Sequence, residues 1–306
     1  MIHVEQPILN QQSRLRALTA INIQDFLAAF GADMARLSPT QRLLAALCTP
    51  PARRFAYQMI AFDDSVGQLG LNIASSRMLR RYVRHVEIYG QEHIPVAGPL
   101  LVLSNHPGMT DALILFSSLP RRDLRVVAAV RPFLQALPNV SRHLICVPDE
   151  ASGRMGVVRA VLNHLRNGGS ILTFPAGEIE PDPRSMPDAV ESLTKWSESI
   201  ALFARMVPEV QIVVTIVSGV IWQAAVNSPV TRLRRARKDR ERLGAALQAF
   251  IQLSLPFYKP VDVQVRFSPA HSPAELAESM ETSAIIEAIT AQAKRLIEQC
   301  QSGGKR

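Results

Sequence analysis

The chain has 306 residues, of which 47% are hydrophobic and 20% charged, and its formal net charge is +8. This composition is typical of a folded globular protein and excludes wholesale disorder. Its cysteines, Cys48, Cys146 and Cys300, lie too far apart for a zinc motif or a disulfide framework, and its histidines form no metal-binding pattern. We therefore expect no metal site, and the positive charge favours an anionic partner.

The N-terminal part, residues 1–85, is predicted to be a helical region. Apolar residues recur at helical spacing in three runs, and prolines separate these runs from one another. Gly67 and Gly70 weaken the third run or divide it in two. The expected helices are Arg14–Leu37, Thr40–Cys48 and Ala52–Arg84, with breaks at Pro39 and Pro50–Pro51.

From Val86 onward, strand-like and helix-like runs alternate. This alternation predicts an α/β fold with a mainly parallel central sheet flanked by helices, over residues 86–300, after the N-terminal helical region. Residues 301–306 are expected to form a flexible tail. The expected strands are Val86–Gly90, Leu100–Leu103, Leu124–Val130, Leu144–Val147, Ser170–Phe174, Val210–Val217 and Val261–Phe267. The expected helices are Thr110–Phe116, Gly153–Asn167, Ser192–Met206, Arg232–Leu253 and Pro273–Gln299, with a short helix or loop over Arg131–Leu137.

No segment is expected to span a membrane. The first 20 residues lack the apolar core of a signal peptide. The most apolar stretch, Ile212–Val226, is shorter than the roughly 20 residues that cross a bilayer. We expect a cytoplasmic protein that lies peripherally on the inner face of the membrane.

One motif combines a strand, a turn and a possible acid–base pair. The apolar run Leu100–Leu103 leads into a turn that contains His106, and Asp111 follows five positions after the histidine. Residues five apart inside one helix do not meet, but a histidine just before a helix can meet a carboxylate in its first turns. Such a contact would fix one imidazole tautomer and make the other ring nitrogen more basic. The alternative interpretation is a simple capping arrangement at a helix start.

Two basic clusters accompany this motif. Arg77, Arg80, Arg81 and Arg84 recur at a spacing that would place them on one helix face, and a second cluster runs from Arg232 to Arg242. No nucleic-acid-binding motif accompanies them, so we expect no nucleic acid partner. An anionic membrane surface is the partner that we expect, and a merely solvated helix face remains the alternative.

Three blocks of sequence resemble the PlsC-type glycerol-3-phosphate and lysophosphatidate acyltransferase superfamily, over roughly residues 80–220. They are Ser104–Asp111, Ile171–Glu178 and Val210–Ser218. The resemblance implies transfer of a fatty acyl group from an acyl-CoA or acyl-carrier-protein thioester to a hydroxyl of a lipid or glycerolipid acceptor. It implies that His106 is the general base and that Asp111 orients it, with no cofactor besides the acyl donor as co-substrate. The substrate-binding residues expected from it are Asn105, Gly108, Thr110, Phe174, Pro175, Gly177, Glu178, Arg154 and Arg184.

Several positions depart from the family pattern. Ala176, Glu178 and Ile179 stand where the family has its glutamate, threonine and phosphate-binding arginine, and Asp149–Glu150 follow another strand that usually ends in arginine. Arginine suits phosphate because its donors form a planar fork. Arg154 or Arg184 could replace the missing arginines. Otherwise the acceptor is not simple glycerol 3-phosphate, and Glu178 either meets a cationic or hydroxyl-rich headgroup or caps the turn after Gly177.

The sequence also leaves an alternative function open. Because the acceptor blocks differ from the family pattern, the chain could be a catalytically weak lipid- or acyl-binding protein on the same fold. The intact pair of His106 and Asp111 favours the enzyme.

Overall fold

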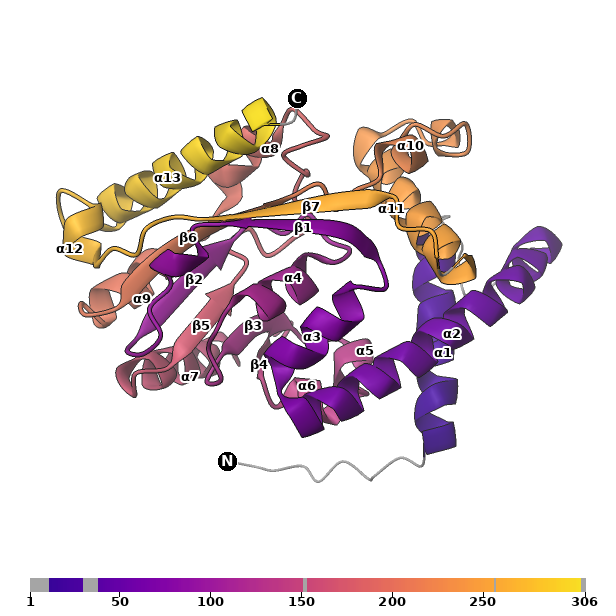
Figure 1. Cartoon of the computed structure of the whole chain (residues 1–306), viewed down its shortest axis with the longest axis horizontal. Helices are drawn as coiled ribbons and strands as arrows, with labels where there is room; N and C mark the ends of the chain where they lie inside the picture. Colours follow the sequence, from indigo (N-terminus) through magenta and orange to yellow (C-terminus); the bar gives the residue numbers. More distant parts are fainter. Residues whose placement is uncertain (1–10, 30–37, 151–152, 256, 304–306) are drawn as a thin grey trace.

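The computed structural model describes residues 11–29, 38–150, 153–255 and 257–303 of the chain (Figure 1). The strands are β1 Val83–Tyr89, β2 Leu100–Ser104, β3 Arg125–Ala129, β4 Leu144–Val147, β5 Ser170–Thr173, β6 Gln211–Ser218 and β7 Val261–Phe267. The helices are α1 Gln11–Ala29, α2 Pro39–Leu69, α3 Leu71–Leu79, α4 Asp111–Ser118, α5 Pro132–Gln135, α6 Pro138–Ser141, α7 Arg154–Arg166, α8 Ala189–Ser192, α9 Ser199–Met206, α10 Gln223–Val226, α11 Arg237–Ser254, α12 Pro273–Leu276 and α13 Thr282–Gly303. Short 3₁₀ helices lie at η1 Gln91–His93, η3 Leu193–Lys195 and η4 Thr231–Leu233.

The seven strands form one sheet in the order β1-β7-β6-β2-β5-β3-β4. Neighbouring strands run parallel to each other except at the β6–β7 pair. The expected α/β fold, with a mainly parallel sheet flanked by helices and an N-terminal helical region, is confirmed.

Both faces of the central strands β2, β5 and β6 are buried, and successive residues of each strand point to opposite faces. On β2, Leu100 and Val102 pack in one apolar cluster, with α2, α3 and α4. Leu101 and Leu103 pack in the other, with α7, α9 and α13. Figure 1 shows the strands across the middle of the molecule, with α13 on one side and α3 and α4 on the other. The two covered faces explain why β2 reads as a continuous apolar run.

The expected break at Pro50–Pro51 is wrong, since α2 continues from Pro39 to Leu69 with both prolines inside it. A proline removes a backbone donor and usually breaks a helix. Tertiary packing overrides this preference here: Cys48, Ala52 and Ala56 are buried on both sides of the prolines. The side chain of Asn22 on α1 also donates to the Ala52 carbonyl at 3.2 Å.

The third expected helix is divided at Gly70, whose φ of 83° ends α2 and begins α3. Because α3 ends at Leu79, the arginines at positions 77 to 84 do not share one helix face, and that expectation is wrong. Arg84 lies on β1 and pairs with Asp262 at the start of β7. The expected first helix extended to Leu37, but residues 30–37 lie outside the described part of the chain.

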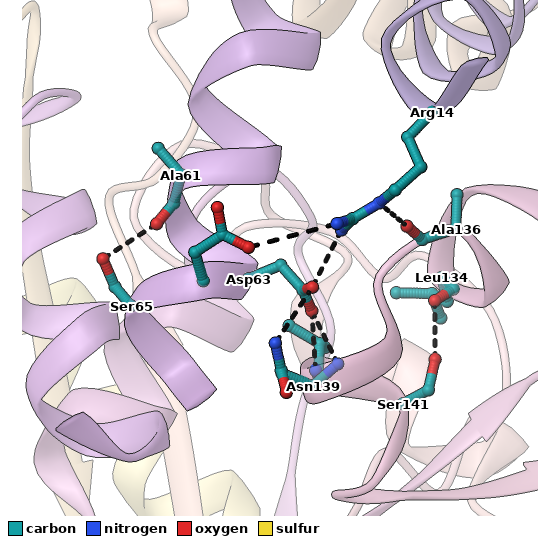
Figure 2. A network of polar contacts seen from close by, with 10 residues as sticks. Arg14, Ala61, Asp63, Ser65, Leu134, Ala136, Asn139 and Ser141 are labelled. Atoms are coloured by element: carbon teal, nitrogen blue, oxygen red, sulfur yellow. Dashed lines mark hydrogen bonds and ion pairs between the residues drawn. The ribbon is translucent and has the colours of Figure 1, made fainter. Parts of the chain in front are cut away.

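The helical region is joined to the α/β region by a buried carboxylate. Figure 2 shows Asp63 of α2 between Arg14 of α1 and Asn139 of α6. Arg14 Nη2 lies 2.9 Å from Asp63 Oδ2, and the backbone N–H groups of Asn139 and Val140 each donate to Oδ1 at 2.9 Å. Arg14 Nε also donates to the Ala136 carbonyl. One side chain therefore ties together three helical segments.

The proposed division of the chain at residue 85 stays a prediction. The first strand begins at Val83, and the helices before it share an apolar cluster with the sheet. The expected tail at 301–306 is helical as far as Gly303, because α13 ends there, and residues 304–306 lie outside the described part.

Candidate active site

The motif residues lie at the carboxyl ends of the central strands. β2 lies between β5 and β6, and it ends at Ser104, directly before Asn105 and His106. Ligands of open parallel sheets usually bind outside this edge. Asn105 is buried, and its side-chain amide donates to the Val217 carbonyl at 2.9 Å and accepts from the Val217 N–H at 2.8 Å. The structure thus gives Asn105, expected to bind substrate, a contact that joins β2 to β6.

The turn after His106 reverses the backbone so that Asp111 faces the imidazole. Gly108 and Met109 both have left-handed conformations, with φ of 87° and 58°. Glycine adopts this region readily, whereas the side chain of Met109 makes it strained. Gly108 also approaches Ile179 so closely that an added Cβ would lie 3.2 Å from Cδ1. The two left-handed residues explain how residues five apart can meet.

Asp111 Oδ2 lies 2.7 Å from His106 Nδ1, and it also accepts from the Gly108 N–H at 2.8 Å. The other oxygen, Oδ1, accepts from the Ala112 N–H at 2.6 Å. The carboxylate of Asp111 is thus held at three points. It favours the imidazole tautomer that carries a proton on Nδ1, in which Nε2 can accept a proton. Burial lowers the pKa of His106, but the hydrogen bond and charge of Asp111, together with the charge of Glu180, raise it above its ordinary value.

A second carboxylate, Glu180, contacts the same histidine and was missed in the sequence. Its Oε2 accepts from the His106 N–H at 2.9 Å, and its own N–H donates to the His106 carbonyl at 2.8 Å. Trp196 Nε1 and Ser192 Oγ donate to Oε1 at 2.9 and 3.2 Å. Burial raises the pKa of Glu180 despite these bonds. Glu180 lies two positions after the block Ile171–Glu178 that resembles the family, and no pattern in the sequence singles it out.

The segment after β5 forms the second wall of the site. The Phe174 ring packs on His106 with 4.4 Å between ring centroids. The Pro175 carbonyl accepts from the Ser197 N–H at 3.0 Å, and the Gly177 N–H closes a turn onto the Phe174 carbonyl at 3.0 Å. Gly177 has φ of 65°, which favours glycine at this turn.

The charged residues that were expected to bind the acceptor lie in different places. Glu178 forms an ion pair with Lys195 on η3, with 2.6 Å between Oε1 and Nζ. Arg184 donates to the Asp262 carbonyl at 3.1 Å, so its guanidinium is directed to β7. Arg154 begins α7 and is exposed. The structure therefore does not gather these three residues at one point. It pairs Glu178 with Lys195, a residue that the sequence did not single out.

An apolar cavity of about 510 Å³ begins beside the histidine turn. Met109 and Thr110 line it together with side chains from α1, α2, α4, α5, α6 and α11. The Thr110 hydroxyl is buried and has no hydrogen-bond partner among the described residues. Buried polar groups are nearly always paired, so this hydroxyl is free to bond to a ligand.

Among the described residues, no group of three or more histidine, cysteine, aspartate or glutamate side chains could hold a metal ion. Within the same residues, no helix is long and apolar enough to cross a membrane.

Comparison with known proteins gives a family match for the part of the chain that contains the site. Residues 85–220 match the family model described as Acyltransferase. The matched segment contains β2, β5, β6 and the His106 turn, so the resemblance of this part of the sequence to the acyltransferase superfamily is confirmed. The chain is also similar to the crystal structure of the 1-acyl-sn-glycerophosphate (LPA) acyltransferase PlsC from Thermotoga maritima, with 13% identity, a TM-score of 0.45, and coverage of 94% of this chain and 95% of that one. No curated protein sequence matches the chain.

Proposed function

We propose that this protein is an acyltransferase that moves a fatty acyl group from an acyl-CoA or acyl-carrier-protein thioester to a hydroxyl of a lipid acceptor. The observation that carries the proposal is the 2.7 Å contact between His106 and Asp111 at the carboxyl end of the central strand. It lies inside the segment that matches the family. No cofactor is needed besides the acyl donor.

The chemistry is direct transfer with general-base catalysis. Nε2 of His106 takes the proton of the acceptor hydroxyl while the oxygen attacks the thioester carbonyl. The carbon–sulfur bond breaks, and the leaving thiolate receives the proton from the imidazolium. Asp111 keeps the ring in the required tautomer and stabilises its positive charge. The acyl group does not become attached to the enzyme.

The apolar cavity is our candidate site for the acyl chain. Its volume lies within the roughly 300–1,000 Å³ that is common for ligand pockets. Because Met109 and Thr110 follow His106 within four residues, a chain in this cavity would place its thioester near the base. The unpaired Thr110 hydroxyl is then suited to donate a hydrogen bond to the thioester carbonyl oxygen.

The acceptor that we propose has a cationic or hydroxyl-rich headgroup, not simple glycerol 3-phosphate. Glu178 stands at a position where the family has a neutral residue. It pairs with Lys195, whose charge also interacts with that of Glu180, so both charges lie beside the segment after β5. Nη1 of Arg184, the arginine that could replace the missing phosphate-binding arginine, donates to the Asp262 carbonyl on β7. A charged or hydroxyl-rich headgroup would bind to Glu178 and Lys195 in place of the contact that they make with each other.

We further propose that the protein binds an anionic membrane surface on the inner, cytoplasmic face. A hollow of about 560 Å³ on α2 is lined by Arg53, Arg54 and Arg81, and no acidic side chain of the described residues lines it. On the same helix, Leu43 and Leu47 are exposed. Each basic residue near an anionic bilayer contributes about 1 kcal/mol.

Vesicle co-sedimentation tests the membrane proposal. Wild-type protein should bind phosphatidylglycerol vesicles more strongly than phosphatidylcholine vesicles. The double variant Arg53→Ala/Arg54→Ala should lose about thirtyfold in affinity, which corresponds to two residues at that energy. The control is Arg122→Ala/Arg125→Ala, which removes the same charge from exposed positions outside α2. Equal losses in the two variants would contradict the assignment of the surface.

An acyl-transfer assay tests the catalytic proposal. Purified protein is given radiolabelled acyl-CoA or acyl-carrier protein with a panel of lipid acceptors. His106→Ala should abolish turnover and keep the circular dichroism spectrum, whereas His93→Ala, an exposed histidine in η1, should retain turnover. Lipid binding that is unchanged in His106→Ala, with no turnover in wild type, would support the alternative of a catalytically weak lipid-binding protein. Robust turnover with glycerol 3-phosphate alone would contradict the acceptor proposal.

A further inference from the structure

We propose that Glu180 is a positioning residue for the catalytic base, which holds the backbone of His106 while Asp111 holds its ring. This inference rests on the proposed function, because it assumes that His106 is the base. It adds a second carboxylate to the pair that the sequence motif contains.

The contact between the two residues is reciprocal. The His106 N–H donates to the Glu180 side chain at 2.9 Å, and the Glu180 N–H donates to the His106 carbonyl at 2.8 Å. Both backbone polar groups of His106 are therefore bonded to one residue. With Asp111 on Nδ1 and the Phe174 ring against the imidazole, the base is held at its backbone, its ring edge and its ring face. Such preorganisation is what general-base catalysis requires.

The carboxylate of Glu180 is itself firmly held. Glu180 is only 4% exposed, and its second oxygen accepts from Trp196 and Ser192. Ser192 ends α8, and Trp196 directly follows η3. Glu180 therefore connects the turn after β2 with the segment over α8 and η3. A buried carboxylate costs free energy even when it is bonded. Burial raises the pKa of Glu180, and the hydrogen bonds from Trp196, the His106 N–H and Ser192 oppose this shift by favouring the ionised form.

The charge of Glu180 also acts on the imidazole. The carboxylates that raise the pKa of His106 are Asp111 on α4 and Glu180. Lys195 on η3 is the cation near Glu180, and it is in turn paired with Glu178 and near Glu191. Because an imidazolium is favoured by a nearby negative charge, removal of the Glu180 charge should lower the pKa of His106.

The experiment is a titration of His106 by NMR in protein labelled with ¹³C-histidine, where His106→Ala identifies the resonance. In Glu180→Gln the pKa of His106 should fall by about 0.5 to 1 unit relative to wild type. The matched control is Glu191→Gln, which removes the charge of an exposed residue on α8. It should move the pKa by less than about 0.2 unit.

Activity separates the charge of Glu180 from its positioning role. Glu180→Asp keeps the charge but shortens the side chain, so its carboxylate no longer reaches the His106 N–H. We expect the kcat of this variant to fall at least tenfold, with KM within a factor of three of wild type. The acid limb of its profile of kcat/KM against pH should stay within about 0.3 pH unit of wild type. Glu180→Gln should move the acid limb of kcat/KM to lower pH, in parallel with its NMR titration.

The proposal is overturned if Glu180→Gln folds and leaves the pKa of His106 unchanged, or if Glu180→Asp retains full kcat. In wild-type protein the His106 amide should be protected from hydrogen exchange, and an unprotected amide would overturn the proposal even if no variant folded. The NMR and exchange measurements need no turnover. They can therefore succeed or fail independently of the proposed acyl transfer, which His106→Ala tests.

Discussion

Replacement of Asp63 by alanine should cost the protein about 4 kcal/mol of stability. Asp63 is fully buried, and its carboxylate accepts from Arg14 of α1 and from the Asn139 and Val140 N–H groups of α6 (Figure 2). Alanine removes all of these acceptors together. The guanidinium of Arg14, which is only 16% exposed, is then left without the partner that it contacts at 2.9 Å.

The magnitude follows from two effects that overlap. Removal of one partner of a buried ion pair typically costs about 3–5 kcal/mol, because the other charge stays buried. Each buried N–H group that loses its acceptor costs about 1–3 kcal/mol, less where water can enter. The two effects are not additive, since opening the site to water relieves both. Asp63→Asn, which retains one oxygen for the backbone N–H groups, should cost about 2 kcal/mol.

Urea denaturation followed by far-ultraviolet circular dichroism measures these differences. The matched control is Asp64→Ala, at the next position on the same helix. Asp64 is 51% exposed and lies 4.0 Å from Arg14, so its loss should cost no more than about 0.5 kcal/mol. If Asp63→Ala were no more destabilising than Asp64→Ala, the reasoning that this carboxylate joins the helical region to the sheet would be refuted.

Three further predictions concern the site. Asp111→Asn should lower kcat by about a thousandfold in the acyl-transfer assay and keep the fold, because an amide favours the wrong imidazole tautomer; a loss below tenfold would contradict the pairing. Thr110→Val should leave the denaturation midpoint unchanged or raised, since it removes an unpaired buried hydroxyl, and should lower kcat about tenfold; unchanged kcat would exclude its role at the carbonyl. Because the folded pKa of His106 is raised, the protonated ring contributes stability that is fully present below about pH 6.5 and is lost as the pH rises through the folded value. The stability difference between wild type and His106→Gln should therefore fall as the pH rises from about 6 to 8, and a flat or rising difference in denaturation midpoints would contradict the shift.

Much of the fold could be predicted because the sequence patterns that indicate its strands and helices are local. Strand β2 is a run of apolar residues followed by turn residues, and the alternation of such runs with helices indicates a layered α/β fold. The prediction failed at Pro50 and Pro51, where burial of Cys48, Ala52 and Ala56 keeps the helix continuous. The helix propensity of a residue does not include the packing of its helix against segments that are distant in the sequence.

The sequence by itself determined the fold class, the resemblance to acyltransferases and the spacing of His106 and Asp111, because each depends on residues close together in the chain. Only the tertiary structure decided that left-handed residues turn Asp111 back onto the imidazole, and that Glu180, 74 positions away, holds the same histidine. It also decided that Arg184 binds β7 and that Asn105 joins β2 to β6. These contacts follow from the order of strands in the sheet, which brings the ends of β2, β5 and β6 together. No spacing along the chain carries that information.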